Sequence, residues 1–220
     1  MNMVKRLSGA ILFLLAVPVF VWRHGEITYA TLCYVAFTIG WLVIRERLTR
    51  GQTLKTVTAN VDGLEKATLF ATAIGMMLLP VIALYTPLLD FALYTPTMAA
   101  FVAGTVATAL GAYVFFRAHA DLGAYWSPTL EIRDGHQLIT SGIYSRVRHP
   151  MYTAIFLICI GQALLLENWL AGIAGLIAFT ALYVLRVGRE EKLMIEQFGE
   201  TYQAYAARTP RLIPSLRTRS

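Results

Sequence analysis

Charged residues and cysteines are both scarce in this 220-residue sequence. Only 15% of the residues are charged and 57% are hydrophobic, whereas about 25% are charged in an average soluble domain. A soluble protein of this length has no interior large enough to hide so much apolar side chain, so the composition predicts lipid as the solvent. The two cysteines, Cys33 and Cys159, fall inside apolar runs, which gives little support to a disulfide framework and predicts buried thiols.

Several motifs of soluble enzymes are also missing. There is no Gly-x-Gly-x-x-Gly between a strand and a helix and no strand–helix alternation, which excludes a Rossmann cofactor site. No His/Cys cluster has metal-ligand spacing and no serine lies in a nucleophile elbow, so we expect no metal. The net charge is +6, but the basic residues are not interleaved with aromatics. A bilayer with anionic headgroups is therefore a better partner than nucleic acid.

Long apolar runs are what the sequence does contain. A helix that crosses the hydrocarbon core needs about 20 apolar residues. Such runs predict helices at 7–23, 27–45, 67–89, 97–118, 151–166 and 169–187. Only Glu167-Asn168 separates the last two, which predicts a tight helical hairpin. We expect an all-α, polytopic membrane helix bundle with about six transmembrane helices.

The basic residues predict how this bundle is oriented. Eighteen of the 19 Lys and Arg residues fall in segments that six helices would place on one side, and the other side holds only Arg23. This is the positive-inside pattern. It predicts a multi-pass integral membrane protein with cytoplasmic N- and C-termini. The polar loop 119–150 and the tail 188–220 would lie on the same side, so a site built from them would face the cytoplasm.

The start of the fifth helix and the end of the sixth should meet at this boundary. Pro150 suits the first turn of a helix, so His149 would cap a helix whose amide dipoles favour an anion. Arg186 and Glu190 are four residues apart and share a helix face. His149 could also be a half-exposed cap, and Arg186 could be a snorkelling interfacial cation with Glu190 as an ordinary surface partner. The residues alone predict a polar pocket at the mouth of the bundle and name no cofactor.

One ordered set of residues resembles the signature of the isoprenylcysteine carboxyl methyltransferase family. The match covers residues 119–214 and keeps order and spacing throughout, whereas a lone Arg-His-Pro would be a weak signal. The set reads His136-x-Leu138-x-Thr140-x-Gly142-x-Tyr144, Arg148-His149-Pro150-x-Tyr152, Asn168, Arg186-x-x-x-Glu190-Glu191 and Phe198-Gly199-x-x-Tyr202-x-x-Tyr205.

The resemblance implies a membrane enzyme that moves the methyl group of S-adenosyl-L-methionine to a lipophilic acceptor, with the carboxylate of a prenylated cysteine as the leading expectation. Arg186 matches the position that holds the substrate carboxylate and would be the catalytic and substrate-binding residue. Thr129 departs from the family, because some members have a cofactor-contacting Gln there. The cofactor-binding positions carried over are His136, Gln137, Leu138, Ile139, Tyr144, His149, Pro150, Met151, Tyr152 and Glu190.

The resemblance also divides the chain. Residues 1–95, with helices one to three, would be a substrate-side scaffold. Residues 96–220 would be the methyltransferase-like catalytic region, with helices four to six, the loop 119–150 and an amphipathic tail. In that tail Met194, Phe198, Tyr202 and Tyr205 form one apolar stripe.

Three other functions stay open at this point. A phospholipid-amine or thiol methyltransferase would need deprotonation of its acceptor, for which His149 is the candidate. An NADPH-dependent sterol-type reductase would use Arg146 and Arg148 for phosphates. A non-catalytic lipid-binding membrane protein could keep the same fold. The acceptor and the oligomeric state are not readable from the sequence.

Overall fold

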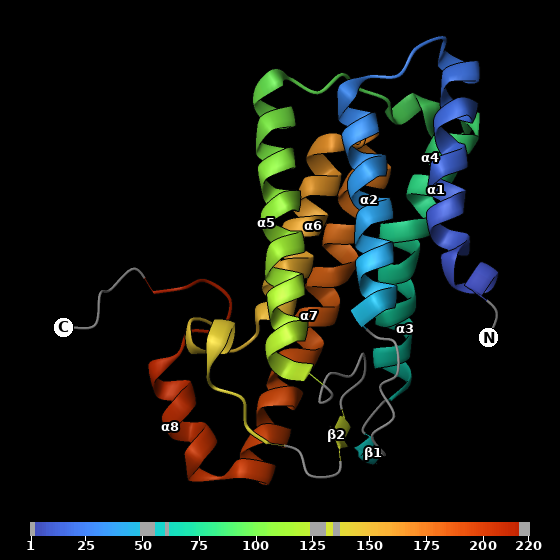
Figure 1. Ribbon diagram of the computed structural model, residues 1–220. Helices are drawn as coiled ribbons and strands as arrows, with labels where there is room; N and C mark the ends of the chain where they lie inside the picture. The colour runs from blue at the N-terminus through green and yellow to red at the C-terminus, as the bar shows by residue number, and fades with distance from the viewer. Residues whose placement is uncertain (1–2, 49–55, 60–61, 124–130, 134–136, 216–220) are drawn as a thin grey trace.

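A computed structural model describes residues 3–48, 56–59, 62–123, 131–133 and 137–215 of the chain. Its long helices stand side by side in an elongated bundle (Figure 1). Their bounds lie close to the predicted apolar runs, and the all-α fold class is confirmed. The helices of the bundle are α1 (Met3–His24), α2 (Tyr29–Leu48), α3 (Gly63–Ala73), α4 (Leu79–Tyr85), α5 (Met98–Leu122), α6 (Pro150–Leu165) and α7 (Trp169–Phe198).

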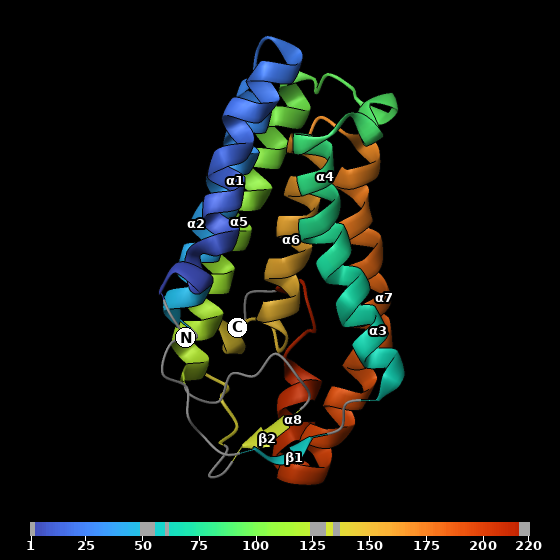
Figure 2. The same cartoon turned by 90° about the vertical axis from the view of Figure 1, so that its right-hand side faces the viewer.

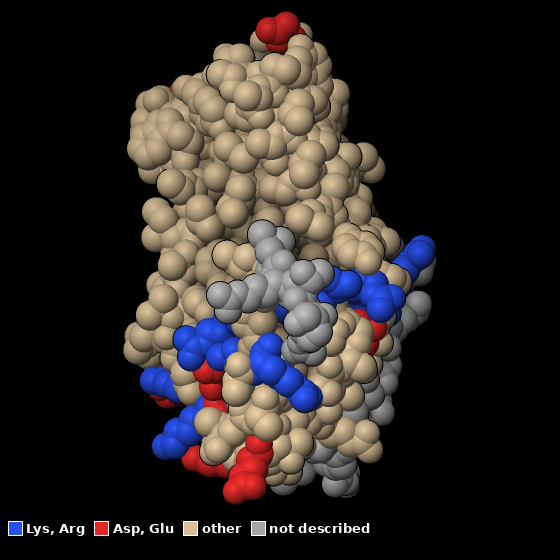
Figure 3. Space-filling model, turned by 90° about the vertical axis from the view of Figure 1, so that its left-hand side faces the viewer, with Lys and Arg blue, Asp and Glu red and all other residues tan. Residues whose placement is uncertain are grey.

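The bundle is an integral membrane structure. Among the described residues, three helical segments are long and apolar enough to cross a bilayer, namely Gly63–Tyr85, Met98–Leu122 and Trp169–Phe198, and two shorter apolar helices accompany them. Large apolar side chains lie on the outside, as a lipid-facing surface requires. The face in Figure 3 carries its Lys, Arg, Asp and Glu side chains mostly towards one end. The number of spans and the side on which the termini lie stay predictions.

A π-helical turn joins α3 to α4. This turn, η1 (Ile74–Leu78), keeps the segment 63–85 continuous. The Gln162 side chain of α6 donates to the Gly75 carbonyl in this turn, at 2.9 Å, and also to the Ala171 carbonyl of α7. A Cβ at Gly75 would lie 2.7 Å from the Ala174 carbonyl carbon. The missing side chain therefore lets α7 pass at backbone contact.

The predicted hairpin is present as α6 and α7. Asn168 caps α7 by accepting from the Ala171 amide at 3.0 Å. A 3-10 helix, η2 (Pro87–Ala92), lies at the same end of the bundle. At the other end, β1 (Thr56–Ala59) pairs antiparallel with β2 (Glu131–Arg133), and the 3-10 helix η4 (Gly142–Ser145) follows (Figure 2). Segments 46–66 and 119–150, which are far apart in the sequence, are therefore joined.

The tail differs from the prediction. α7 continues past residue 187 to Phe198, and Gly199 then takes a positive φ of 55° that turns the chain into α8 (Glu200–Arg208). The apolar stripe is divided between the two helices, and Tyr202 and Tyr205 are buried within the protein. The stripe therefore serves packing within the protein, and Gly199 ends α7 within it because glycine permits this backbone conformation.

The cysteines are only partly as predicted. Both are free thiols, and Cys159 is buried, but Cys33 is half-buried with its sulfur 3.6 Å from the Thr105 hydroxyl.

Candidate functional site

Ionisable side chains gather where α6 begins and where α7 passes beyond the apolar part of the bundle. They come from α3, from the loop before α6, from α7 and from the segment after α8. We call this group the site cluster. Its members are Glu65, Arg148, His149, Tyr152, Arg186, Glu190, Glu191 and Arg211.

His149 lies at the centre of the cluster as the N-cap residue of α6. It is buried, its Nε2 lies 3.1 Å from Glu191 Oε1, and its Nδ1 lies 3.7 Å from Glu190 Oε1. Burial by itself lowers the pKa of a histidine, but the hydrogen bonds and charges of these two carboxylates outweigh it and raise the pKa above its ordinary value. The imidazolium form is therefore stabilised, and the ring is held between two consecutive residues of α7.

Glu190 is the partly open carboxylate of the cluster. Its side chain is 31% exposed, and its Oε2 accepts a hydrogen bond from the Tyr152 hydroxyl at 2.6 Å. The Tyr152 ring is buried, and its centroid lies 5.2 Å from that of Tyr183 and 5.6 Å from that of His149. An anion with free access on one side and aromatic rings beside it is a suitable site for an organic cation.

Arg186 lies on the same face of α7, one turn before Glu190, and is buried. Its Nε is 3.6 Å from Glu65 Oε1 of α3. α3 begins at Gly63, four residues before the predicted start at 67, because Asp62 caps it by accepting from the Glu65 amide at 2.7 Å. This early start places Glu65 in the first helical turn, opposite Arg186.

Glu191 joins the loop, α7 and the end of the chain. Its carboxylate accepts from Arg148 Nε at 2.7 Å, from Arg211 Nη2 at 2.6 Å and from His149. Backbone hydrogen bonds also join the loop to the end of the chain, because the Arg148 and His149 amides donate to the carbonyls of Pro210 and Arg211. Residues 209–212 are thereby held against the start of α6.

Four of the residues predicted for the site lie together. His149, Tyr152, Arg186 and Glu190 are in or against the cluster, and Pro150 forms the buried first turn of α6 below them.

The other predicted positions are less directly placed. The Tyr144 hydroxyl points at the Ala118 carbonyl of α5, at 3.4 Å, and the Tyr144 carbonyl accepts from Tyr205 of α8. Met151 packs against the apolar group of Val114 and Phe115, on the α5 side. Gln137 is exposed, and Leu138 and Ile139 are half-buried in an irregular segment. His136 and Thr129 lie outside the described residues.

The sequence reasoning missed Glu65 and Arg211 and left Glu191 without a role. Glu65 had one usable signal, which is an acidic residue at the start of an apolar run, three residues after the capping residue Asp62. That signal predicts a helix start and says nothing about which helix faces it. Arg211 carried no signal, because its place depends on how α8 returns the chain.

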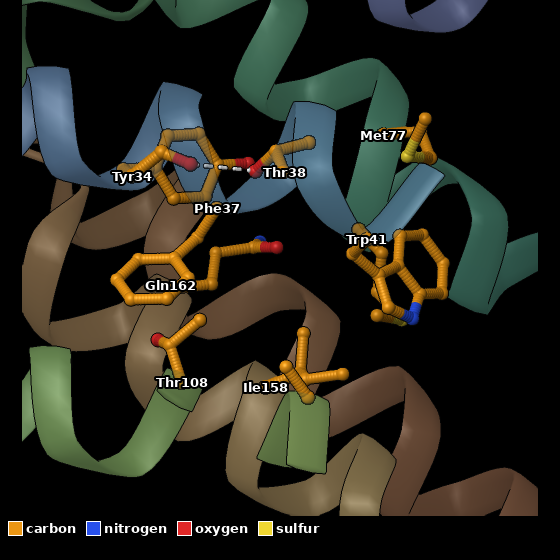
Figure 4. A pocket seen from close by; sticks show the side chains of 10 residues that line it. Tyr34, Phe37, Thr38, Trp41, Met77, Thr108, Ile158 and Gln162 are labelled. Carbon is orange, nitrogen blue, oxygen red and sulfur yellow. Dashed lines mark hydrogen bonds between the residues drawn. The ribbon is translucent and has the colours of Figure 1, made fainter. Parts of the chain in front are cut away.

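An apolar pocket lies among α2, η1, α5 and α6 on the membrane side of the cluster (Figure 4). Its cavity volume is small, about 30 Å³. Met76 and Ile158 line it and also pack in the same apolar group as Tyr152. The pocket and Tyr152 of the cluster therefore share neighbours in one apolar group.

The region that holds α6 and most of α7 matches a known family. Residues 102–196 match the sequence model of the Isoprenylcysteine carboxyl methyltransferase (ICMT) family. The chain is 33% identical over 79 residues to a Protein-S-isoprenylcysteine O-methyltransferase of Schizosaccharomyces pombe, which is 36% of this chain and 34% of the relative. It is 37% identical over 87 residues to the Xenopus laevis protein of that name, which is 40% of this chain and 30% of the relative. The match thus spans about a third of the length of these relatives.

A solved structure extends the likeness to the fold. It is described as that of the eukaryotic intramembrane Ras methyltransferase ICMT without a monobody, and it covers 97% of this chain and 87% of its own, with a TM-score of 0.51 and 18% identity. The resemblance to this family that the sequence motifs indicated is confirmed.

Proposed function

From the family match of residues 102–196, we propose that the chain is a membrane methyltransferase that uses S-adenosyl-L-methionine to methylate the carboxylate of a lipophilic acceptor of the prenylated-cysteine class. The observation that carries the proposal is the position of Arg186 and Glu190, which lie one turn apart on one face of α7, beside His149 and Tyr152. Within one helical turn, Arg186 would supply a cation for a carboxylate and Glu190 an anion for an organic cation.

The residues of the cluster fit the cofactor by their chemistry. S-adenosyl-L-methionine would supply a methyl group on a positively charged sulfur. Glu190 is a partly exposed carboxylate, and Tyr152 both donates to it and presents an aromatic ring. Together they would hold an organic cation by charge and by cation–π contact. His149 holds the start of α6 against α7 through its contacts with Glu190 and Glu191.

Arg186 would orient the acceptor carboxylate. A guanidinium presents donors along two edges, so it can hold a carboxylate in one orientation. An acceptor carboxylate is ionised at neutral pH, because its unperturbed pKa is about 4, and the reaction then needs no general base. What remains for the chain is to place the reacting atoms in line and to exclude water.

The structure weakens two of the alternatives. An amine or thiol acceptor needs a base, but both ring nitrogens of His149 face carboxylates, which raise its pKa and stabilise the protonated form. A reductase would need Arg148 for phosphate. The Arg148 guanidinium instead donates to Glu191 and to the Ala206 carbonyl, and its side chain is 12% exposed.

The first test is calorimetric titration of the detergent-solubilised protein with S-adenosyl-L-methionine, repeated with Glu190→Ala. Micromolar binding that the substitution weakens would support the proposal, and methyl transfer to N-acetyl-S-farnesyl-cysteine would then test the acceptor. If the cofactor does not bind while NADPH raises the melting temperature, the methyltransferase proposal fails and the reductase replaces it.

A further inference from the structure

Glu65 is a buried carboxylate without a hydrogen-bonding role of its own. It is 3% exposed, and neither of its oxygens has a hydrogen-bond partner among the described residues. Its charge faces Arg186, but the distance of 3.6 Å from Arg186 Nε to Oε1 is longer than a hydrogen bond. A buried carboxylate normally has donors for both oxygens, because leaving them unmet is costly. This arrangement is therefore one of charge pairing alone.

A second ion pair also joins α3 to α7, and its geometry is that of an ordinary structural contact. Arg189 Nη1 lies 2.6 Å from Asp62 Oδ2, and both side chains are more than 40% exposed. Asp62 also caps α3. This short contact and the backbone packing at Gly75 are sufficient to hold α3 against α7. The loose, buried pair of Glu65 and Arg186 is an addition to that link.

We propose that Glu65 occupies the guanidinium of Arg186 in place of the acceptor carboxylate, competes with the acceptor for it, and re-pairs with it after methylation. This inference rests on the proposed function. Glu65 and an acceptor carboxylate carry the same charge and the same acceptor chemistry, so both are suited to the same cation. Because Glu65 holds Arg186 without a hydrogen bond at its Nε, an acceptor that forms charge-assisted hydrogen bonds can displace it.

The charge change in the reaction makes this competition directional. During transfer the acceptor carboxylate gains a C–O bond as the S–CH₃ bond breaks, and the sulfonium becomes a thioether. No proton moves, and the product is a neutral ester. An ester cannot balance the buried charge of Arg186, whereas Glu65 can. Glu65 would therefore pair with Arg186 again in the ester complex, and its competition would weaken the binding of the acid alone.

The test compares an acid and its ester on matched variants. The ligands are N-acetyl-S-farnesyl-cysteine and its methyl ester, measured by calorimetry on the full chain in detergent with saturating S-adenosylhomocysteine, so that no turnover occurs. Glu65→Gln keeps the size of the side chain and removes its charge. We expect it to tighten acid binding about tenfold, which corresponds to about 1.4 kcal/mol, and to leave ester binding unchanged. Asp62→Asn, at the exposed pair, should change neither affinity.

The ratio of ester to acid dissociation constants is the decisive quantity, because a purely structural role would change both ligands together. Weaker acid binding in Glu65→Gln would overturn the competition and assign Glu65 the opposite task of orienting Arg186. Equal changes for acid and ester, or no change for either, would also overturn it. If Glu65→Gln lowers the melting temperature too far for titration, Glu65→Asp should give a smaller shift of the ratio in the same direction.

Failure of the proposed function gives a different result. If the unaltered protein transfers no methyl group to the acid and binds neither ligand, the acceptor class is wrong. If it methylates the acid but Glu65→Gln leaves the ratio of affinities unchanged, only the role of Glu65 is wrong.

Discussion

The two ends of the helix bundle both bury charge, but they do so in different ways. At the end where α1 meets η2, Arg23 donates to both oxygens of Asp90, at 2.7 and 2.8 Å, and to the carbonyls of Ala83 and Leu84. Glu167 accepts from Thr31 at 2.8 Å, and Asn168 ties α7 to the Leu89 carbonyl. The charged and polar atoms of these groups are hydrogen-bonded within the protein.

At the other end the site cluster combines tight and loose contacts. Glu191 has three donors at short range, whereas Arg186 and Glu65 face each other at 3.6 Å and Glu190 keeps 31% of its side chain exposed. The tight contacts fix the loop and the tail, and the partly exposed carboxylate of Glu190 is accessible from outside the cluster. The two ends therefore differ in how closely their charged groups are paired, and the proposed function assigns a site to the end where Glu190 stays partly exposed.

Arg186→Ala should have the largest effect on activity. We expect the rate of methyl transfer to fall roughly a thousandfold or more, because the acceptor carboxylate loses the cation that orients it, while the affinity for the cofactor stays nearly unchanged. Initial rates at saturating acceptor, with calorimetry of the cofactor, would measure both. Arg189→Ala is the control on the same helix. A substantial residual rate at saturating acceptor would refute the role of Arg186.

Arg23→Ala should have the largest effect on stability and none on the site. Removing Arg23 leaves Asp90 and two carbonyls without their donor, and we expect a loss of about 2–3 kcal/mol in the free energy of unfolding. Denaturation in detergent would measure this, with the exposed Glu26→Gln as control. The rate per folded molecule should stay the same. A changed cofactor affinity would mean that the two ends are coupled, and the contrast between them would have to be abandoned.

Glu190→Ala should weaken the cofactor by about tenfold to a hundredfold, the range expected for a charge-assisted contact of about 1.5–3 kcal/mol. The acceptor KM should change less, since Arg186 is retained. Titration with S-adenosylhomocysteine would measure the affinity. Tyr152→Phe removes the hydroxyl that donates to Glu190 at 2.6 Å and should cause a smaller loss in the same direction. An unchanged affinity in Glu190→Ala would count against its assignment.

The pH dependence of stability should show the smallest effect and concerns His149. Its pKa is raised in the folded protein, so the protonated form adds stability below the unfolded pKa of about 6.5, and this contribution is lost as pH rises through the folded pKa. The difference in melting temperature between the unaltered protein and His149→Gln should therefore be larger at pH 6 than at pH 9. A constant difference across that range would show that the two carboxylates do not hold the imidazolium.

Much of the site could be predicted because its signals are local in the sequence. His149, Pro150 and Tyr152 fall within one turn of the start of α6, and Arg186 and Glu190 lie four apart on α7. A two-residue connection forces α6 and α7 to be antiparallel neighbours, so the two groups had to meet. The helix bounds were predicted less well at 63–66 and 188–198, where polar residues continue a helix beyond its apolar part.

Glu65 could not be predicted as a site residue. It lies 121 positions before Arg186 in the sequence, and no motif of residues 1–95 points to the site. Its place depends on α3 packing against α7, which in turn depends on the small residues at Gly75 and Gly175. The N-terminal region was expected to be a scaffold, and it contributes a charge that faces Arg186 directly.

By itself the sequence determined the solvent, the helices and the family resemblance, because apolar length, cap residues and motif spacing act over one helix or one short connection. Only the tertiary structure decided which charges are tightly paired and which stay loose. Glu65 reaches Arg186, and Arg211 reaches Glu191, through contacts between segments that no local preference brings together. The strength of an ion pair depends on distance and burial, and both are set by how the helices pack and by where Gly199 turns the chain.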